Sequence, residues 1–266
     1  PKVNIGDMEN KGVDLNLTWR DKVGEVDYSI GVNLSHYKNK LTEIGTEAGI
    51  FEGTRISNMN VMMKGYAVGM FHGYQVDGIY KSEDEVRNYK NDAGGAVLPY
   101  GTADAASLNP SQYVGQFKVK DVNNDGKIDA DDRTIIGNPH PDLTGGFNIS
   151  LTWRDFDLST YMYYSIGNDL YKHYEYYTMF GNLQSNYSKD RLAKSWDPVN
   201  NPNGIYPLWT TTSTEGPEAG NESNSNYVQD GSYLRMQTLT LGYSLPKKLL
   251  KKIGFEKIRV YGQISN

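Results

Sequence analysis

A twelve-residue stretch of acidic and amide side chains, DVNNDGKIDADD at residues 121–132, has the spacing of a calcium-binding loop. Oxygen-bearing residues alternate along it, and Gly126 stands where such a loop turns sharply. Ca²⁺ takes about 6–8 oxygen ligands, so alternating oxygens can wrap around it. The expected ligands are Asp121, Asn123, Asp125, the carbonyl of Lys127, Asp129 and Asp132.

The flanks of this loop differ from those of an EF-hand. QFKVK before it predicts a strand, and RTIIGNP after it predicts at most one short turn. The last ligand position also carries Asp132 where an EF-hand has the longer Glu. Without helices to move, a bound Ca²⁺ is expected to be structural rather than regulatory. The alternative is a turn that binds nothing, because Asp, Asn and Gly favour turns on their own account.

Other residues offer little chemistry. The chain has no cysteine, and its four histidines show no metal-ligand spacing. No nucleophile motif or phosphate-binding glycine loop occurs, so we expect no enzyme. An aromatic-rich stretch around residues 161–180 could contact a sugar or a peptide, or could simply pack in a loop or girdle. The candidate substrate contacts in it are Tyr171, Tyr174, Tyr176 and Tyr177.

The net charge and the hydropathy of the chain limit the kinds of partner that it could bind. The 27 basic and 32 acidic residues give a net charge of −5, which argues against nucleic acid as a partner. No run approaches the roughly 18 apolar residues of a helical membrane span. A membrane-crossing strand needs only about 10 residues with every second one apolar.

Such alternation is the main structural signal of the chain. It predicts strands at 12–20, 25–37, 145–154, 156–166, 233–245 and 257–265. Two of them end in the related strings LNLTWRD and ISLTWRD, which place Trp19 and Trp153 beside a tight turn. This suits an interfacial aromatic belt, although a β-sandwich also puts Trp at strand ends.

Connections between the strands are alternately short and long. The short ones are 21–24, 154–155 and 246–257, whereas 39–67, 81–144 and 168–230 are long. This is the pattern of outer-membrane barrels, with short turns at one end and long extracellular loops at the other. The segment 69–80 is either part of an extracellular excursion or a further crossing. In either case strand parity places the calcium-type loop outside the cell.

Several strings resemble the SusC/RagA family of TonB-dependent outer-membrane transporters over essentially the whole chain. They are NKGVDLNLTW, GMFHGYQVDGIYKSEDEV, GQFKVKDVNNDGKIDADDRTIIGNPHPDLTGGF, GNDLY and GSYLRMQTLTLGYSLP. The resemblance implies a barrel of about 22 strands with an N-terminal plug. It also implies import of glycans or peptides with a SusD-like lipoprotein and TonB-derived energy. The location would be the outer membrane of a Gram-negative, Bacteroidetes-like cell.

The plug domain and the TonB-contacting part of that family are absent here, and the predicted strands are fewer than the roughly 8 that close a membrane barrel. We therefore expect an all-β fold in which residues 1–266 form a partial antiparallel transmembrane β-barrel, facing outer-membrane lipid. TonB would act through the missing N-terminal part. The rival is a soluble, calcium-stabilised β-sandwich that binds carbohydrate or acts as an adhesin. In a sandwich the apolar strand faces meet inside one core.

Overall fold

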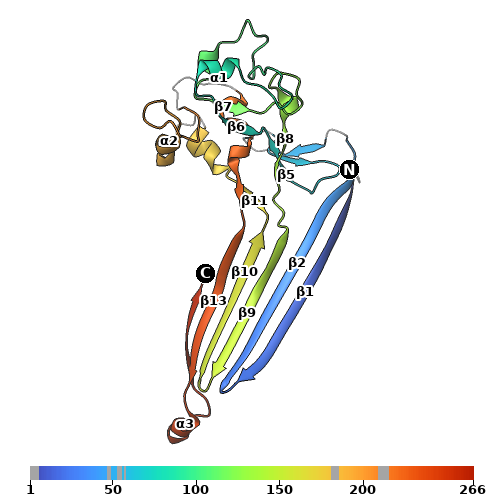
Figure 1. The fold of residues 1–266 in the computed structure, drawn as a ribbon. Helices are drawn as coiled ribbons and strands as arrows, with labels where there is room; N and C mark the ends of the chain where they lie inside the picture. Colours follow the sequence, from blue (N-terminus) through green and yellow to red (C-terminus); the bar gives the residue numbers. More distant parts are fainter. Residues whose placement is uncertain (1–5, 47–48, 53–55, 57, 181–185, 209–215) are drawn as a thin grey trace. The chain divides into compact units, whose positions relative to one another are not determined.

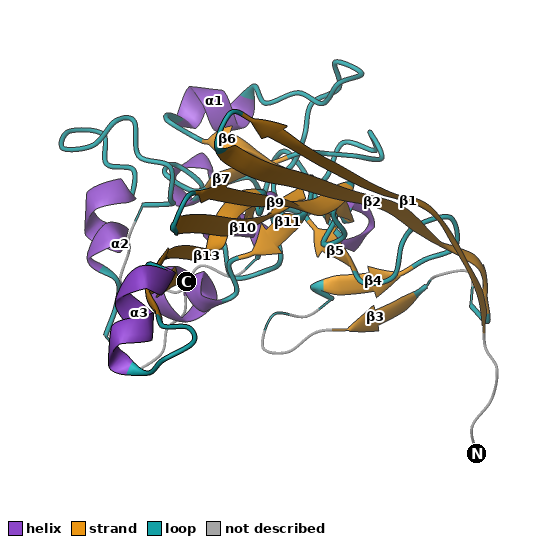
Figure 2. Ribbon diagram, turned by 90° about the horizontal axis from the view of Figure 1, so that it is seen from below, coloured by secondary structure: helices purple, strands orange, loops and turns teal. Residues whose placement is uncertain are grey.

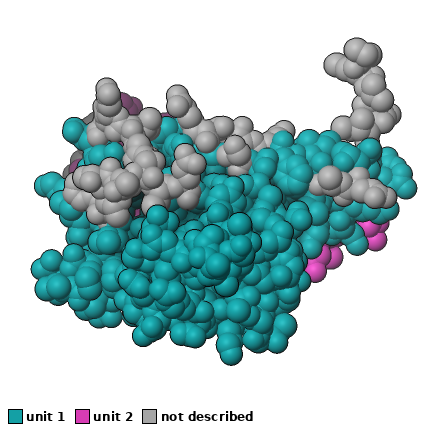
Figure 3. Space-filling view, turned by 90° about the horizontal axis from the view of Figure 1, so that it is seen from above, with its two compact units in different colours: residues 1–8, 40–139, 169–229 teal, residues 9–39, 140–168, 230–266 magenta. Residues whose placement is uncertain are grey.

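The computed structural model describes residues 6–46, 49–52, 56, 58–180, 186–208 and 216–266. The chain divides into two compact units, coloured separately in Figure 3. Unit 1 comprises residues 1–8, 40–139 and 169–229, and unit 2 comprises residues 9–39, 140–168 and 230–266. The first holds the long connections, and the second holds most of the alternating segments.

One antiparallel sheet dominates unit 2, and its six strands are those that alternation predicts (Figure 1). In spatial order they are β1 (Gly6–Val23), β2 (Val26–Ile44), β9 (Leu143–Trp153), β10 (Phe156–Ile166), β13 (Tyr233–Ser244) and β14 (Arg259–Ser265). Both β1 and β2 run beyond their predicted bounds, and residues 6–8 of β1 and 40–44 of β2 belong to unit 1.

The pairing register gives this sheet one apolar and one polar face. Ile30 pairs with Ile149 and Leu158 with Leu151, whereas Ser29 pairs with Ser150. Since side chains alternate along a strand, the paired apolar residues lie on one face of the sheet and the paired polar residues on the other. The apolar face is open in this chain, with Leu17 58% and Leu241 56% exposed.

A β-bulge changes the parity of β13. Tyr161 pairs with Thr238, but the next residue, Met162, pairs with Met236, so Gln237 is the extra residue. Past the bulge, Tyr233 and Arg235 pair with Ser165 and Tyr163, on the polar face. Without this bulge, all odd-numbered residues of β13 would lie on the apolar face.

Tight turns join these strands at one end of the sheet. Gly24 and Arg154 have φ values of +61° and +54°, the left-handed region that short hairpin turns need. Between β13 and β14, the predicted compact link contains α3 (Lys247–Ile253), which ends at Gly254 with φ +76°. Figure 2 shows this helix seen from the tight-turn end of the sheet.

Unit 1 contains short strands and small helices. Its sheets are β3 (Ile50–Glu52), β4 (Asn60–Met62), β5 (Met70–Gly73) and β8 (Thr134–Gly137); β6 (Val76–Ile79) with β7 (Phe117–Val119); and β11 (Asp169–Tyr171) with β12 (Val228–Asp230). Its helices are α1 (Glu83–Arg87) and α2 (Lys189–Lys194).

One alternative for this region is excluded, and one expectation is corrected. The segment 69–80 is not a further strand of the six-stranded sheet, because β5 and β6 belong to two other sheets. They separate at Tyr74, whose N–H donates to the carbonyl of Ser223 at 2.8 Å and whose carbonyl accepts from Ser225 at 2.9 Å. The segment after the calcium-type loop is also more than a turn, since β8 pairs with β5.

The core of unit 1 is largely aromatic. Tyr227 is fully buried, stacks on Tyr171 at 5.3 Å between ring centroids and meets Phe180 edge-on at 5.2 Å. Phe117, Trp196 and Tyr206 are among the other members of this cluster. No helix in the described parts of the chain is both long and apolar enough to cross a membrane.

Candidate functional site

The calcium-type loop closes in unit 1 around two buried carboxylates. Asp121 is 1% exposed and Asp132 is 0% exposed. The Asp121 carboxylate accepts from the N–H groups of Asp125 at 3.2 Å and Gly126 at 2.9 Å. Asp132 accepts from the N–H groups of Val122 at 2.9 Å and Asp129 at 2.8 Å. Burial raises the pKa of Asp132 above its ordinary value, while these N–H groups act in the opposite direction.

The remaining expected ligands lie nearer the surface. Asn123 accepts from the N–H of Asp125, and Asp125 accepts from the N–H of Lys127 at 3.1 Å. The ammonium of Lys127 pairs with Asp129 at 2.8 Å. Within the described residues, no group of three or more His, Cys, Asp or Glu side chains is arranged to hold a metal ion. In this structure the loop is held closed by its own hydrogen bonds.

The loop is anchored to the rest of unit 1 on two sides. Ile128, the apolar residue within the loop, is buried against Tyr74, Val97 and Val119, and its N–H donates to the carbonyl of Leu98 at 2.9 Å. Arg133, directly after the loop, pairs with Glu222 and lies 5.0 Å from the centroid of the Tyr74 ring.

The four tyrosines expected as substrate contacts differ in burial and packing. Tyr171 packs between Phe71 and Tyr227, and its hydroxyl donates to Ser223 at 3.0 Å. Tyr176 and Tyr177 form an edge-on pair at 5.3 Å, while Tyr174 is exposed. Tyr171 thus contributes to the core, and Tyr174 is the most open of the four.

Glu218 is a buried carboxylate that no sequence motif identifies. It is 2% exposed, accepts from the N–H of Tyr100 at 2.7 Å, and its other oxygen is buried without a hydrogen-bond partner among the described residues. Burial raises its pKa from 4.5 to about 7, and Glu222 adds to the shift.

This burial predicts a pH-dependent stability. Because the pKa of Glu218 is higher when folded, the folded state binds more protons than the unfolded state between pH 4.5 and about 7. The free energy of unfolding therefore falls as pH rises through this window. Glu218→Gln should remove roughly 2–3 kcal/mol of that fall, measured as thermal stability at pH 5.5 and pH 8.5. The control Glu83→Gln, at an exposed position, should keep the wild-type pH dependence.

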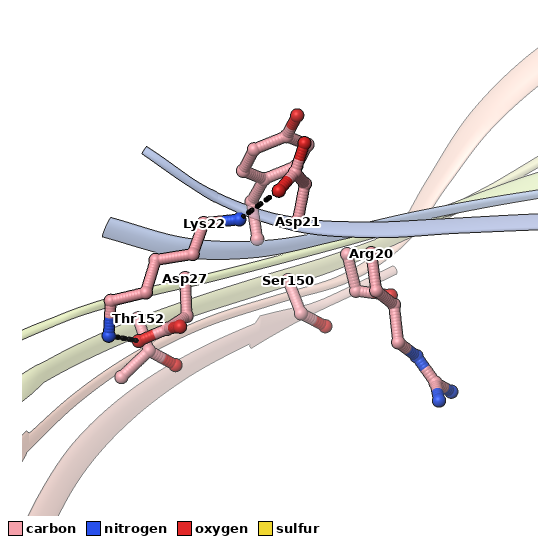
Figure 4. Close-up of a pocket in the computed structure, with 8 residues that line it drawn as sticks. Arg20, Asp21, Lys22, Asp27, Ser150 and Thr152 are labelled. Atoms are coloured by element: carbon pink, nitrogen blue, oxygen red, sulfur yellow. Dashed lines mark hydrogen bonds and ion pairs between the residues drawn. The ribbon is translucent and has the colours of Figure 1, made fainter. Parts of the chain in front are cut away.

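Unit 2 has a polar hollow of about 550 Å³ at its tight-turn end (Figure 4). There Lys22 pairs with Asp27 at 3.2 Å, and the N–H of Lys22 donates to Asp21 at 2.7 Å. Ser150 and Thr152 line it from β9. The side chains are charged and small, which suits a wet surface rather than a catalytic centre.

The apolar face at this same end carries an aromatic belt. Trp153 stacks on Phe156 at 6.3 Å, and Phe156 lies 4.7 Å from Tyr243. Trp19 donates its indole N–H to the hydroxyl of Tyr28 at 3.3 Å. Aromatic rings with polar edges gathered at one height are typical of a membrane–water boundary.

Comparison with known proteins shows a consistent relationship, although no family model matches the chain. The TonB-dependent receptor P3 of Formosa agariphila is 30% identical over 97% of this chain and 24% of that receptor. The TonB-dependent receptor SusC of Bacteroides thetaiotaomicron is 25% identical over 99% of this chain and 23% of that receptor. The chain spans about a quarter of the length of these relatives, which are receptors and not enzymes.

Solved structures show the same fold. A chain of the RagAB peptide transporter matches 99% of this chain and 25% of its own length, with a TM-score of 0.69 at 20% identity. The open-open state of the RagAB peptide importer gives a TM-score of 0.65 over 98% of this chain and 26% of its own. The chain is therefore similar over nearly its whole length to TonB-dependent receptors, SusC among them, and it spans about a quarter of their length.

Proposed function

We propose that this chain forms part of the wall of an outer-membrane β-barrel that imports oligomeric nutrients, glycans or peptides. Unit 2 supplies membrane-crossing strands, with the apolar face toward lipid and the polar face toward the lumen. Unit 1 supplies the extracellular loops. The names of the relatives, TonB-dependent receptors and a peptide transporter, support import powered through TonB with a SusD-like lipoprotein as partner.

One observation carries the proposal: the apolar face of the sheet is open and ends in an aromatic belt. Val13, Leu15 and Leu17 of β1 are all exposed, and so are Val260 and Ile264 of β14 at the other edge. Soluble proteins rarely leave so large an apolar surface in water. A bilayer would cover it with acyl chains, and the belt would lie among the headgroups.

Single-cysteine labelling in intact membranes tests this orientation, since the chain itself has no cysteine. Leu15→Cys and Leu17→Cys should react slowly with a water-soluble maleimide, because lipid shields the apolar face. Asn16→Cys, between them on the polar face, should react faster by at least about tenfold. Equal rates, with the receptor soluble without detergent, would favour the β-sandwich module instead.

We also propose Ca²⁺ as a structural ligand of loop 121–132. Its support is the ligand spacing and the chemistry of the carboxylates. A carboxylate has about four acceptor sites, so Asp121 and Asp132 keep capacity after accepting N–H groups. Binding requires the exposed Asp125 side chain to turn inward and Asp129 to leave Lys127. The hydrogen-bonded turn without metal is the alternative.

Calcium addition should protect this loop from proteolysis. At 100 times the dissociation constant, the stabilisation is about 2.7 kcal/mol. The double variant Asp121→Ala, Asp125→Ala should lose the Ca²⁺-dependent part of the protection. If Ca²⁺ changes the cleavage rate equally little in wild type and variant, the loop is only a turn.

A further inference from the structure

Four tyrosines lie on the polar face of the sheet in unit 2, although tyrosine is usually expected on its apolar side or in a belt. Tyr161 and Tyr163 alternate with the apolar residues of β10, and Tyr163 pairs with Arg235. The bulge at Gln237 brings Tyr233 to this face beside them. Tyr37 of β2 also belongs to it, since its hydroxyl donates to Asp14. We call Tyr37, Tyr161, Tyr163 and Tyr233 the tyrosine track.

Glycines beneath the rings make room for two of these side chains. A Cβ on Gly146 would lie 2.8 Å from the Tyr161 ring, and one on Gly12 would lie 2.3 Å from the Tyr37 ring. Each ring therefore covers a bare stretch of backbone. Tyr37 is 53% and Tyr233 is 42% exposed.

The spacing of the rings suits a chain of linked six-membered rings. Tyr161 and Tyr163 are two residues apart on one strand, which corresponds to about 7 Å. The ring centroids of Tyr163 and Tyr233 are 6.0 Å apart. The guanidinium of Arg235 lies 5.3 Å from the centroid of the Tyr233 ring and holds it in place.

A hollow of about 310 Å³ adjoins Tyr37 on this face, large enough for one sugar ring. Its lining is neutral and rich in donors and acceptors: Asn10, Ser35, Tyr37, Asn39, His140, Pro141 and Thr144. Asn39 donates to Asn10 at 2.7 Å, and Ser35 donates to Asp14 at 2.5 Å. Thr144 pairs with Ser35 on one side and Ser165 on the other, and Ser165 pairs with Tyr233. The hollow and the three other rings thus lie at neighbouring heights.

We propose that the tyrosine track binds oligosaccharides, stacking pyranose rings on its aromatic faces while the flanking Asn, Ser and Thr side chains bind the hydroxyls. This inference rests on the proposed import function and names its substrate class. Sugar rings present apolar C–H faces with hydroxyls around the edge, which matches an aromatic face with neutral polar neighbours. The lining of the hollow at Tyr37 is neutral, so it offers no ion pair to the charged termini of a peptide.

Calorimetric titration of the detergent-solubilised receptor that carries this chain tests the proposal. The probes are maltohexaose, laminarihexaose, xylohexaose and mannohexaose, with a random decapeptide mixture for comparison. At least one hexasaccharide should bind, and Tyr163→Ala should weaken it by about tenfold. Tyr163→Phe keeps the ring and should stay within about threefold of wild type. Leu234→Ala, adjacent to Tyr233 but on the opposite face, should leave affinity unchanged.

Three results would overturn the track: no hexasaccharide binds, binding is unchanged in Tyr163→Ala, or only the decapeptides bind and depend on Tyr163. Membrane fractionation separates these from failure of the import proposal. If the receptor is found in the outer membrane but binds no hexasaccharide, only the proposal of oligosaccharide binding by the tyrosine track is contradicted. A receptor absent from that membrane refutes the proposed function itself.

Discussion

Replacing Ile30 by arginine should destabilise the membrane-inserted receptor by about 2–4 kcal/mol. Ile30 lies on the apolar face of β2 and pairs with Ile149. It is four residues along β2 from Val26, which pairs with the belt residue Trp153. In the proposed orientation that height is near the middle of a bilayer, where a guanidinium cannot be solvated without distorting the lipid. The expected measurement is urea unfolding in lipid vesicles, together with the amount of folded receptor in the outer membrane.

The neighbouring variant Ser29→Arg provides the matched control. Ser29 pairs with Ser150 on the polar face, so its arginine would reach lumenal water. It should change the free energy of unfolding by less than about 1 kcal/mol. If Ile30→Arg and Ser29→Arg behave alike, the apolar face does not meet lipid, because Ile30 is already 40% exposed in this chain.

Replacing Tyr227 by alanine should destabilise unit 1 by about 3–5 kcal/mol. The ring is fully buried between Tyr171 and Phe180, and its hydroxyl donates to the carbonyl of Gly220 at 2.7 Å. Removing it leaves a cavity in the aromatic cluster and an unpaired carbonyl. Hydrogen exchange of the Lys172 N–H, which donates to the carbonyl of Tyr227 at 2.7 Å, should accelerate by about 10²–10³-fold.

Tyr227→Phe separates packing from hydrogen bonding at the same position. It keeps the ring contacts and loses only the bond to Gly220, so the expected cost is about 1 kcal/mol. Exchange in β9 and β10 should be unaffected by both variants, since these strands belong to the sheet of unit 2. A loss of protection throughout unit 2 would contradict this assignment of Tyr227.

The large sheet could be predicted from local sequence patterns. The alternation of apolar and polar residues around Leu17 and Leu151 is a local pattern, and it predicts strands without tertiary information. The tight turn at Arg154 is predicted from the same local sequence. The residue types and spacing of loop 121–132 likewise predicted a turn there. Whether Ca²⁺ binds there stays a prediction, because ligand spacing does not fix where each carboxylate points.

By contrast, the organisation of unit 1 and the orientation of part of β13 depend on contacts between residues far apart in the sequence. Segment 69–80 alternates like a strand, but residues 223–225 bond to Tyr74 from 149 positions away in sequence and divide it. Glu218 has no local signal, since its pKa depends on burial by residues distant in sequence. The bulge at Gln237 reverses the alternation of β13 and puts Tyr233 on the polar face. A bulge is set by pairing with the neighbouring strand, and sequence periodicity within one strand does not contain that register.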